Sequence, residues 1–299
     1  MQTRPTDQPA VTLRRVYAVI NPMSGGVGRA AAGQMAALLA EHGLDHRITE
    51  FAPGASNRRV RAAIDAGPDL VVVLGGDGTA RWVAEMCGPE GPLVAPLSGG
   101  TKNKLSHALY GAGSWREALS DAITRGAARW VPGGVAEGRA FYCRAVLGPP
   151  ALLAPAREAI RFRQLGQAWR RAVYATRQAR RTRVNYETDG EIGSGLALGL
   201  ICPTVSRAEG EPAPALEAAV LDLQGAKAGV RLALTNLIGD WRDDPDMTVR
   251  PWVSGRAWAR EPIPAMLDGE FFPLGRQVHA RFQPHAFRAL APEGEREPG

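Results

Sequence analysis

The stretch Asp69–Thr79, DLVVVLGGDGT, decides the fold class of this chain. Its first half, Asp69–Leu74, has no polar residue after the aspartate, as expected for a parallel strand covered on both faces. GGDGT at Gly75–Thr79 predicts a loop, and Ala80–Cys87 predicts the next helix. A buried strand that leads through glycines into a helix is typical of α/β proteins, which bind ligands at the carboxyl ends of their strands.

The same alternation of strands and helices continues on both sides of this stretch. We expect further strands at Val16–Ile20, Asp45–Phe51 and Leu93–Leu97, and helices at Arg29–Glu41, Asn57–Ala66, Lys104–Tyr110 and Ser114–Thr124. This order predicts an N-terminal, doubly wound α/β domain over residues 1–130.

After about Trp130 the alternation fades, which predicts a second, mostly β domain over residues 131–283. The expected strands are Phe141–Leu147, Leu196–Ile201, Ala218–Leu223, Met247–Trp252, Ala257–Arg260 and Val278–Gln283. The segment Pro155–Arg183 is predicted to be partly helical. It carries nine arginines against one acid, Glu158.

Three loops rich in glycine follow three of the predicted strands: NPMSGG from Asn21, GGDGT from Gly75 and SGGTKN from Ser98. The glycines of Gly75–Thr79 let backbone N–H groups converge on an anion, and the following helix N-terminus adds positive charge. Asp77 fits beside phosphates if Mg²⁺ or a hydroxyl proton offsets the repulsion; the alternative is an Asp that caps a plain turn. Thr101 and Asn103 offer side-chain donors.

Two other patterns leave alternatives open. Gly26-x-Gly28-x-x-Ala31 resembles a dinucleotide fingerprint, but Asn21–Gly25 separate it from the strand, and the chain has no P-loop pattern. Leu267–Glu270, LDGE, is either an ordinary Asp-Gly turn or a turn that presents a general base.

Composition limits the partners and the compartment. The net charge of +6, mostly from arginine, favours anionic partners. Three cysteines outside any C-x-x-C pair, Cys87, Cys143 and Cys202, predict a reduced, cytoplasmic chain. No stretch approaches the ~20 apolar residues of a membrane span. The polar first ten residues predict a loose tail rather than a signal peptide.

Taken in order and at these separations, NPMSGG, GGDGT, PLSGGTKN and LDGE resemble the diacylglycerol kinase catalytic-domain family, which is distantly related to NAD kinases and phosphofructokinases. The resemblance extends from about Val16 to Pro292. It implies an ATP-binding domain, a β-rich lipid domain, and a last segment, 284–299, that returns to the first domain.

The resemblance also implies roles for individual residues. Glu270 corresponds to the proposed proton acceptor, with Asp268 beside it, and Asp77 is our candidate for contact with Mg²⁺ carried by ATP. The expected nucleotide-binding residues come from the strand ends and the glycine loops: Asn21, Ser24, Gly25, Thr49, Gly75, Gly76, Asp77, Gly78, Thr79, Gly100, Thr101 and Asn103.

The chain departs from the family pattern at three places. Ala80-Arg81-Trp82 replaces an apolar residue followed by Asn-Glu, Lys104 replaces an acid, and Ala218 replaces an aspartate of a structural Mg²⁺ site. We therefore predict no such structural metal. Three consequences of these changes stay open: direct contacts of Arg81 and Lys104 with phosphate, an altered specificity, or a weakened enzyme.

The sequence thus predicts an ATP- and Mg²⁺-dependent lipid kinase of the diacylglycerol kinase type. A nucleotide-binding regulator of the same fold and a kinase of a soluble acceptor are the alternatives. The expected partners are ATP and a lipid acceptor, with no nucleic acid. Peripheral contact with the anionic inner face of the membrane is expected through Arg157–Arg183, and a homodimer is left open.

Overall fold

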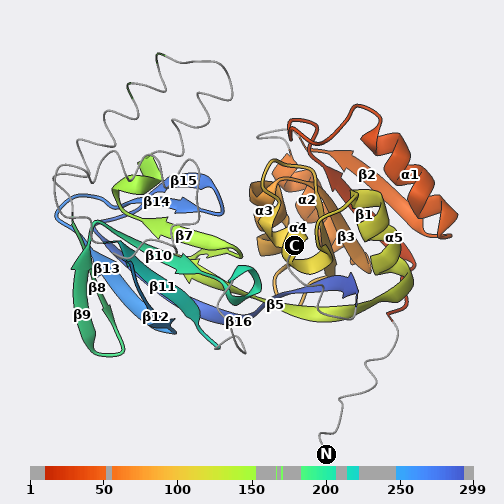
Figure 1. The fold of residues 1–299 in the computed structure, drawn as a ribbon. Coiled ribbons are helices and arrows are strands. Elements are labelled where there is room, and N and C mark those ends of the chain that lie inside the picture. Colours follow the sequence, from red (N-terminus) through yellow and green to blue (C-terminus); the bar gives the residue numbers. More distant parts are fainter. Residues whose placement is uncertain are drawn as a thin grey trace, which may run out of the picture. The chain divides into compact units, whose positions relative to one another are not determined.

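The computed structural model describes residues 11–51, 56–152, 166, 170, 183–206, 214–221 and 247–292. The chain divides into two compact units, one formed by Met1–Val131 with His285–Gly299 and the other by Pro132–Pro284. Figure 1 shows the course of the chain through both. Two strands, β5 (Gly126–Ala136) and β16 (Gln277–Pro292), each run from one unit into the other.

The first unit is built on a parallel sheet with the order β2-β1-β3-β4. Its strands are β1 (Arg15–Ile20), β2 (Asp45–Glu50), β3 (Leu70–Gly75) and β4 (Leu93–Ser98), and its helices are α1 (Ala31–Glu41), α2 (Ser56–Asp65), α3 (Asp77–Cys87), α4 (Lys104–Tyr110) and α5 (Trp115–Arg125). The expected doubly wound α/β domain is confirmed.

Burial explains why these segments fold in this way. Every residue of β3 is buried, as a strand covered on both faces requires. In α1, Ala31, Met35 and Leu39 form a stripe at four-residue spacing. This stripe packs with residues of α5 and alternate residues of β1, β3 and β4 in one apolar core.

The C-terminal part of β16 completes this unit. Ala289 pairs in parallel with Val94 of β4, and Leu290 lies in the core. The buried hydroxyl of Tyr110 donates to the carbonyl oxygen of Leu290 (2.8 Å), and burial raises the pKa of this tyrosine well above its usual value.

The second unit is mostly β, as expected. A six-stranded antiparallel sheet has the order β12-β11-β10-β7-β14-β15, while β9, β8 and β13 pair in series with the first part of β16. The strands are β6 (Arg139–Phe141), β7 (Arg144–Leu147), β8 (Val184–Thr188), β9 (Glu191–Gly195), β10 (Ala197–Ile201), β11 (Leu216–Leu221), β12 (Met247–Trp252), β13 (Ser254–Trp258), β14 (Pro264–Leu267) and β15 (Glu270–Pro273), with 3₁₀ turns η1 (Pro149–Leu152) and η2 (Pro203–Val205).

Some local predictions were wrong. The loop expected at Gly75–Thr79 is a strand end and a helix start, because Gly75 closes β3, Asp77 opens α3, and Gly76 alone lies between them. The single strand expected at Phe141–Leu147 is split at Tyr142–Cys143, where the backbone N–H groups bond a side chain instead of a strand. The strands β5, β8, β9, β14 and β15 were not predicted.

Two expectations concern the membrane. Among the helices that the structure describes, none has the length and apolarity to span a bilayer. The arginine-rich segment expected to contact a membrane, Arg157–Arg183, lies outside the described residues except for Gly166, Arg170 and Arg183.

Candidate functional site

The candidate site lies at the carboxyl edge of the parallel sheet in the first unit. Ile20 is in register with Glu50 of β2 and Leu74 of β3, and Gly75 is in register with Ser98 of β4. The four strands therefore end at one edge. This register brings Asn21, Thr49 and Gly75 together there, although they are far apart in the sequence.

The loops that follow β1 and β4 meet at the end of β3. The Gly26 N–H donates to the Gly99 carbonyl oxygen (2.9 Å), and the Gly99 N–H donates to the Gly75 carbonyl oxygen (2.9 Å). A Cβ atom on Gly100 would lie 2.6 Å from the Cα of Gly76, and one on Gly99 would lie 2.8 Å from the Gly75 nitrogen. These approaches are too close for any side chain, so glycine is required for the packing itself.

Side chains of the first loop fix the junction of β3 and α3. The Nδ2 of Asn21 donates to the Oγ1 of Thr79 (2.8 Å), and the Asn21 Oδ1 accepts from the Met23 N–H (3.0 Å). The Oγ of Ser24 accepts from the Gly76 N–H (3.2 Å). No neighbour among the described atoms lies within 4 Å of a Cβ built on Gly25, so this glycine faces open space.

The junction places the start of α3 at the centre of this edge. Asp77, Gly78 and Thr79 form its first turn, and the Ala80 N–H is bonded to the Gly76 carbonyl oxygen (3.1 Å). The N–H groups before Ala80 have no partner of their own within the helix, and the helix dipole makes this end positive. A helix N-terminus, in place of the expected loop, therefore offers the backbone donors that an anion could use here.

Two polar side chains expected to contact a ligand hold the turn after β4. The Asp77 Oδ1 accepts from the Leu105 N–H (3.2 Å) and so caps the neighbouring helix α4. Asn103, in the left-handed region at φ 46°, accepts from the Gly100 N–H (2.7 Å) and donates back to the Gly100 carbonyl oxygen (2.9 Å). This geometry favours a positioning role for both residues.

The remaining candidates of the first unit are Thr49, Thr101 and the cations. Thr49 is half-buried in β2, and Thr101 is exposed in the turn after β4. Arg81 is buried and forms an ion pair with Glu85 one turn later (2.9 Å). The direct contact of Arg81 with phosphate that the sequence left open therefore competes with this ion pair.

The LDGE segment lies in the second unit, as a two-residue hairpin turn between β14 and β15. Asp268 (φ 47°) and Gly269 (φ 92°) both have positive φ, as an Asp-Gly turn of type I′ requires. The buried Asp268 carboxylate accepts from the backbone N–H groups of Tyr142 (2.7 Å), Cys143 (2.9 Å) and Arg144 (2.8 Å). These bonds favour a structural role for Asp268, where the sequence predicted a catalytic one.

Glu270 differs from Asp268 in its surroundings. It is the first residue of β15, pairs with Leu267 across the hairpin, and is exposed. An exposed carboxylate can exchange protons with a substrate or with water, whereas a carboxylate surrounded by backbone donors cannot do so without breaking them.

Two glycines, Gly26 and Gly99, were not among the predicted nucleotide residues, although both hold the edge together. The sequence could have indicated both, because Gly26 follows the predicted Gly25 and Gly99 precedes the predicted Gly100. Only the structure reveals that they contact one another.

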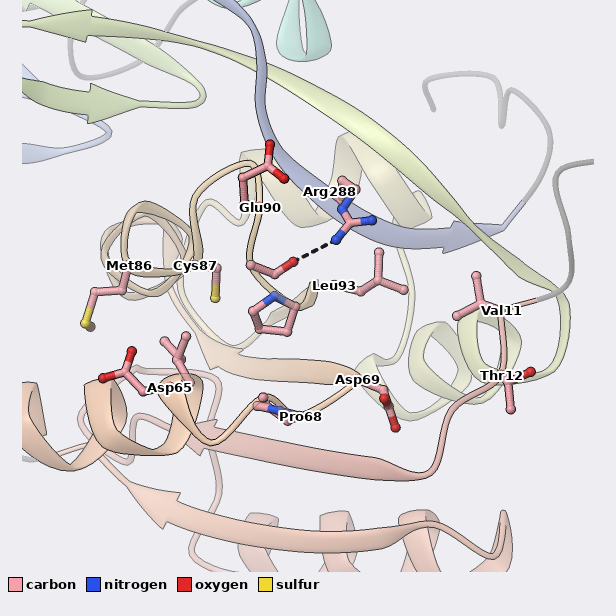
Figure 2. A pocket seen from close by; sticks show the side chains of 14 residues that line it. Val11, Thr12, Asp65, Pro68, Asp69, Met86, Cys87, Glu90, Leu93 and Arg288 are labelled. Atoms are coloured by element: carbon pink, nitrogen blue, oxygen red, sulfur yellow. Dashed lines mark hydrogen bonds between the residues drawn. The ribbon is translucent and has the colours of Figure 1, made fainter.

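A hollow of about 670 Å³ lies at the opposite, amino-terminal edge of the same sheet, between the ends of α2 and α3 and the loops into β3 and β4. Figure 2 shows Arg288 of β16 reaching over it, with its Nη2 donating to the Gly91 carbonyl oxygen (2.9 Å). Burial raises the pKa of the Cys87 thiol in its wall to about 12, so this thiol stays protonated and unreactive near neutral pH. The hollow is thus separate from the edge that carries the glycine loops.

Part of the chain matches a known protein family. Residues 15–134 match the model of the diacylglycerol kinase catalytic domain. No curated protein sequence matches the chain significantly.

Solved structures share the fold at low sequence identity. A diacylglycerol kinase from Bacillus anthracis str. Sterne is similar with a TM-score of 0.64 at 16% identity, covering 94% of this chain and 98% of that one. An NAD kinase from Archaeoglobus fulgidus, solved in complex with ATP, is similar with a TM-score of 0.53 at 12% identity, covering 93% of this chain and 94% of that one. The resemblance inferred from the motifs is confirmed over residues 15–134, which match the diacylglycerol kinase catalytic-domain family.

Proposed function

We propose that this protein is an ATP-dependent kinase that phosphorylates a hydroxyl group of diacylglycerol or a related lipid. The observation that carries the proposal is the packing of the glycine loops against the N-terminus of α3 within a diacylglycerol kinase catalytic domain. That domain supports a kinase of this family, and the ATP complex of the related NAD kinase fold supports ATP as the phosphoryl donor.

In this proposal the first unit holds the nucleotide. The free N–H groups of Asp77, Gly78 and Thr79 would donate to phosphate oxygens at the positive end of α3. Phosphoryl transfer depends on positioning and charge neutralisation more than on covalent chemistry with the protein. The hydrogen bonds of Asn21, Ser24 and Asn103 would hold the loops at this edge of the sheet in position before the nucleotide binds.

Mg²⁺ fits this edge only as an ion carried by the nucleotide. The described residues contain no cluster of three metal-binding side chains, and one oxygen of Asp77 already caps α4. A single carboxylate together with nucleotide phosphates and waters is a normal environment for Mg²⁺. Bound in this way, the ion would neutralise charge that develops on the transferred phosphoryl group.

Glu270 is our candidate for the group that accepts the proton of the acceptor hydroxyl. Its carboxylate is exposed at a rigid hairpin turn, and the buried Asp268 anchors that turn through three backbone N–H groups. Asp268 would then act by positioning Glu270 rather than by chemistry.

The test is phosphoryl transfer from labelled ATP to a panel of diacylglycerol, monoacylglycerol and sphingoid bases, with the product identified by mass spectrometry. We expect one lipid class to be phosphorylated, and Glu270→Gln to lower kcat at least about a hundredfold. Transfer that Glu270→Gln and Asp77→Ala leave unchanged would contradict the roles assigned to these residues.

A specific observation favours a second candidate, a nucleotide-binding regulator without kinase activity. Asp77 is occupied as a cap, and Arg81 stands where the family has an uncharged residue, paired with Glu85. This candidate predicts ATP binding by calorimetry with no turnover on any lipid. A kinase of a soluble acceptor is distinguished by sedimentation, because it needs no attachment to liposomes.

A further inference from the structure

The outer face of the β8-β13-β16 sheet in the second unit carries a polar surface that the proposed kinase reaction does not use. Alternation along the strands separates it from the core: Ala257 and Val278 are buried, while Arg256, Gln277 and Arg281 are exposed. The cross-strand register pairs Trp258 with Gln277, and Ser254 with Arg281.

A hollow of about 460 Å³ opens on this face at the end of β13. The residues that line it are Arg256, Trp258, Ala259, Arg276 and Gln277. They contribute two guanidinium groups, one indole and one amide, but no carboxylate. Its walls are held together by the backbone, since the Ala259 N–H donates to the Arg276 carbonyl oxygen (2.9 Å).

One of the two guanidinium groups is held in place before any ligand binds. The Nε of Arg256 donates to Glu187 Oε2 (2.7 Å), its Nη2 lies 2.6 Å from the same oxygen, and its Cζ lies 5.2 Å from the centroid of the Trp258 ring. Glu187 offsets the charge of Arg256, so Arg276 gives the lining its excess positive charge. A fixed planar guanidinium beside a second cation suits the oxygens of a phosphate group.

The surroundings favour a membrane over a small free anion. Arg260, two residues after the end of β13, and Arg281 of β16 are both exposed, so arginine side chains continue beyond the hollow. Trp258 is half-buried, with an apolar ring and a polar N–H, and tryptophan is enriched at the membrane–water interface. A flat anionic bilayer can use the whole face, whereas a free phosphate would use the hollow alone.

We propose that this hollow binds the phosphate of an anionic phospholipid headgroup and docks the second unit on a membrane surface. The site is distinct from the nucleotide edge, and it goes beyond the proposed kinase function. Its test contains neither ATP nor an acceptor lipid, so its failure would leave the kinase proposal untouched.

The experiment is flotation of the full-length protein with vesicles of phosphatidylcholine alone, and with vesicles of phosphatidylcholine and phosphatidylglycerol in equal amounts. We expect binding to the anionic vesicles only. Arg276→Gln should weaken binding to the anionic vesicles about fivefold or more, because the loss of one basic residue near an anionic surface has about that effect. Arg276→Lys should restore most of this binding. Trp258→Leu should weaken it as well.

Arg59→Gln is the matched control, because it removes the same charge from an exposed position on α2 in the first unit, outside this face. A reduction as large as that of Arg276→Gln would show general attraction and overturn the site. Unchanged binding by Arg276→Gln, equal binding to both kinds of vesicle, or no binding by the wild-type protein would overturn it too. Binding of soluble glycerol 3-phosphate in calorimetry, without vesicle binding, would assign the hollow to free phosphates and also contradict the proposal. Unfolding curves that match the wild type establish that each variant is folded.

Discussion

At the scale of single residues, the packing of Gly100 against Gly76 is the tightest requirement of the candidate site. A methyl group on Gly100 would lie 2.6 Å from the Gly76 Cα, and that backbone cannot move without displacing the start of α3. We expect Gly100→Ala to cost about 1–3 kcal/mol of stability and to weaken binding of an ATP analogue at least about tenfold. Urea unfolding and calorimetry measure the two effects.

Gly33→Ala is the control for this substitution. A Cβ at Gly33 meets no atom within 4 Å, and the residue lies inside α1, where alanine should stabilise by roughly 0.5–1 kcal/mol. Full analogue binding by Gly100→Ala would contradict the nucleotide site at this edge.

The two acids of the hairpin turn should respond in opposite ways to loss of charge. Asp268→Asn leaves one oxygen for three backbone donors and should cost about 3 kcal/mol or more in the free energy of unfolding. Glu270→Gln, on an exposed side chain, should change stability by less than about 0.5 kcal/mol while it lowers kinase activity. A stable but inactive Asp268→Asn protein would return the catalytic role to Asp268.

Asp69 should make part of the free energy of unfolding depend on pH in the acidic range. Its Oδ2 accepts from the backbone N–H groups of Arg15 and Arg14 (2.8 Å each), and the bond from Arg15 is the main cause that lowers the pKa of this carboxyl below 3.8. The ionised form therefore stabilises the fold above about pH 4, and this contribution is lost as the pH falls through the lowered pKa. Urea midpoints from pH 3 to 7 should fall less steeply at the acid end for Asp69→Asn; parallel curves would exclude this role.

At the scale of helices and strands, the sequence predicts the elements whose signal is local. The unbroken apolar run of β3 and the stripe of α1 specify those elements without help from distant residues. The end of β3 was mispredicted because Gly75 and Gly76 suggest a loop, whereas the contacts of Gly99 and Ser24 hold these residues in a direct strand-to-helix junction. The hairpin of β14 and β15 was missed because its prolines conceal the strand pattern, although Asp268-Gly269 marked the turn.

The end of β16 offers a test at this scale. Leu290 is buried in the core of the first unit, and its carbonyl oxygen accepts the Tyr110 hydroxyl. We expect Leu290→Ala to cost about 2–5 kcal/mol, because the cavity would open beside β4. Arg281→Ala, exposed on the same strand, should stay within about 0.5 kcal/mol. Equal unfolding midpoints for the two variants would mean that β16 contributes little to this unit.

At the scale of the whole molecule, the candidate nucleotide edge is assembled from residues up to about eighty positions apart in the first unit, between Asn21 and Asn103. The sequence could name the loops because each carries its own glycines, and parallel strands place their carboxyl ends together. It could not assign the polar side chains. Whether Asp77 contacts a ligand or caps α4 depends on the position of Leu105, which local sequence does not reveal.

A nucleotide bound at this edge should protect the nearby backbone amides from hydrogen exchange. Hydrogen exchange with and without a non-hydrolysable ATP analogue and Mg²⁺ should slow at residues 21–28, 75–80 and 98–105, since their amides lie at the edge or are ordered by it. The strands β10 and β11 should exchange at unchanged rates, because they lie in the core of the second unit. Protection confined to the hollow beneath Arg288 would move the nucleotide to the opposite edge of the sheet, and the kinase proposal would lose the geometry on which it rests.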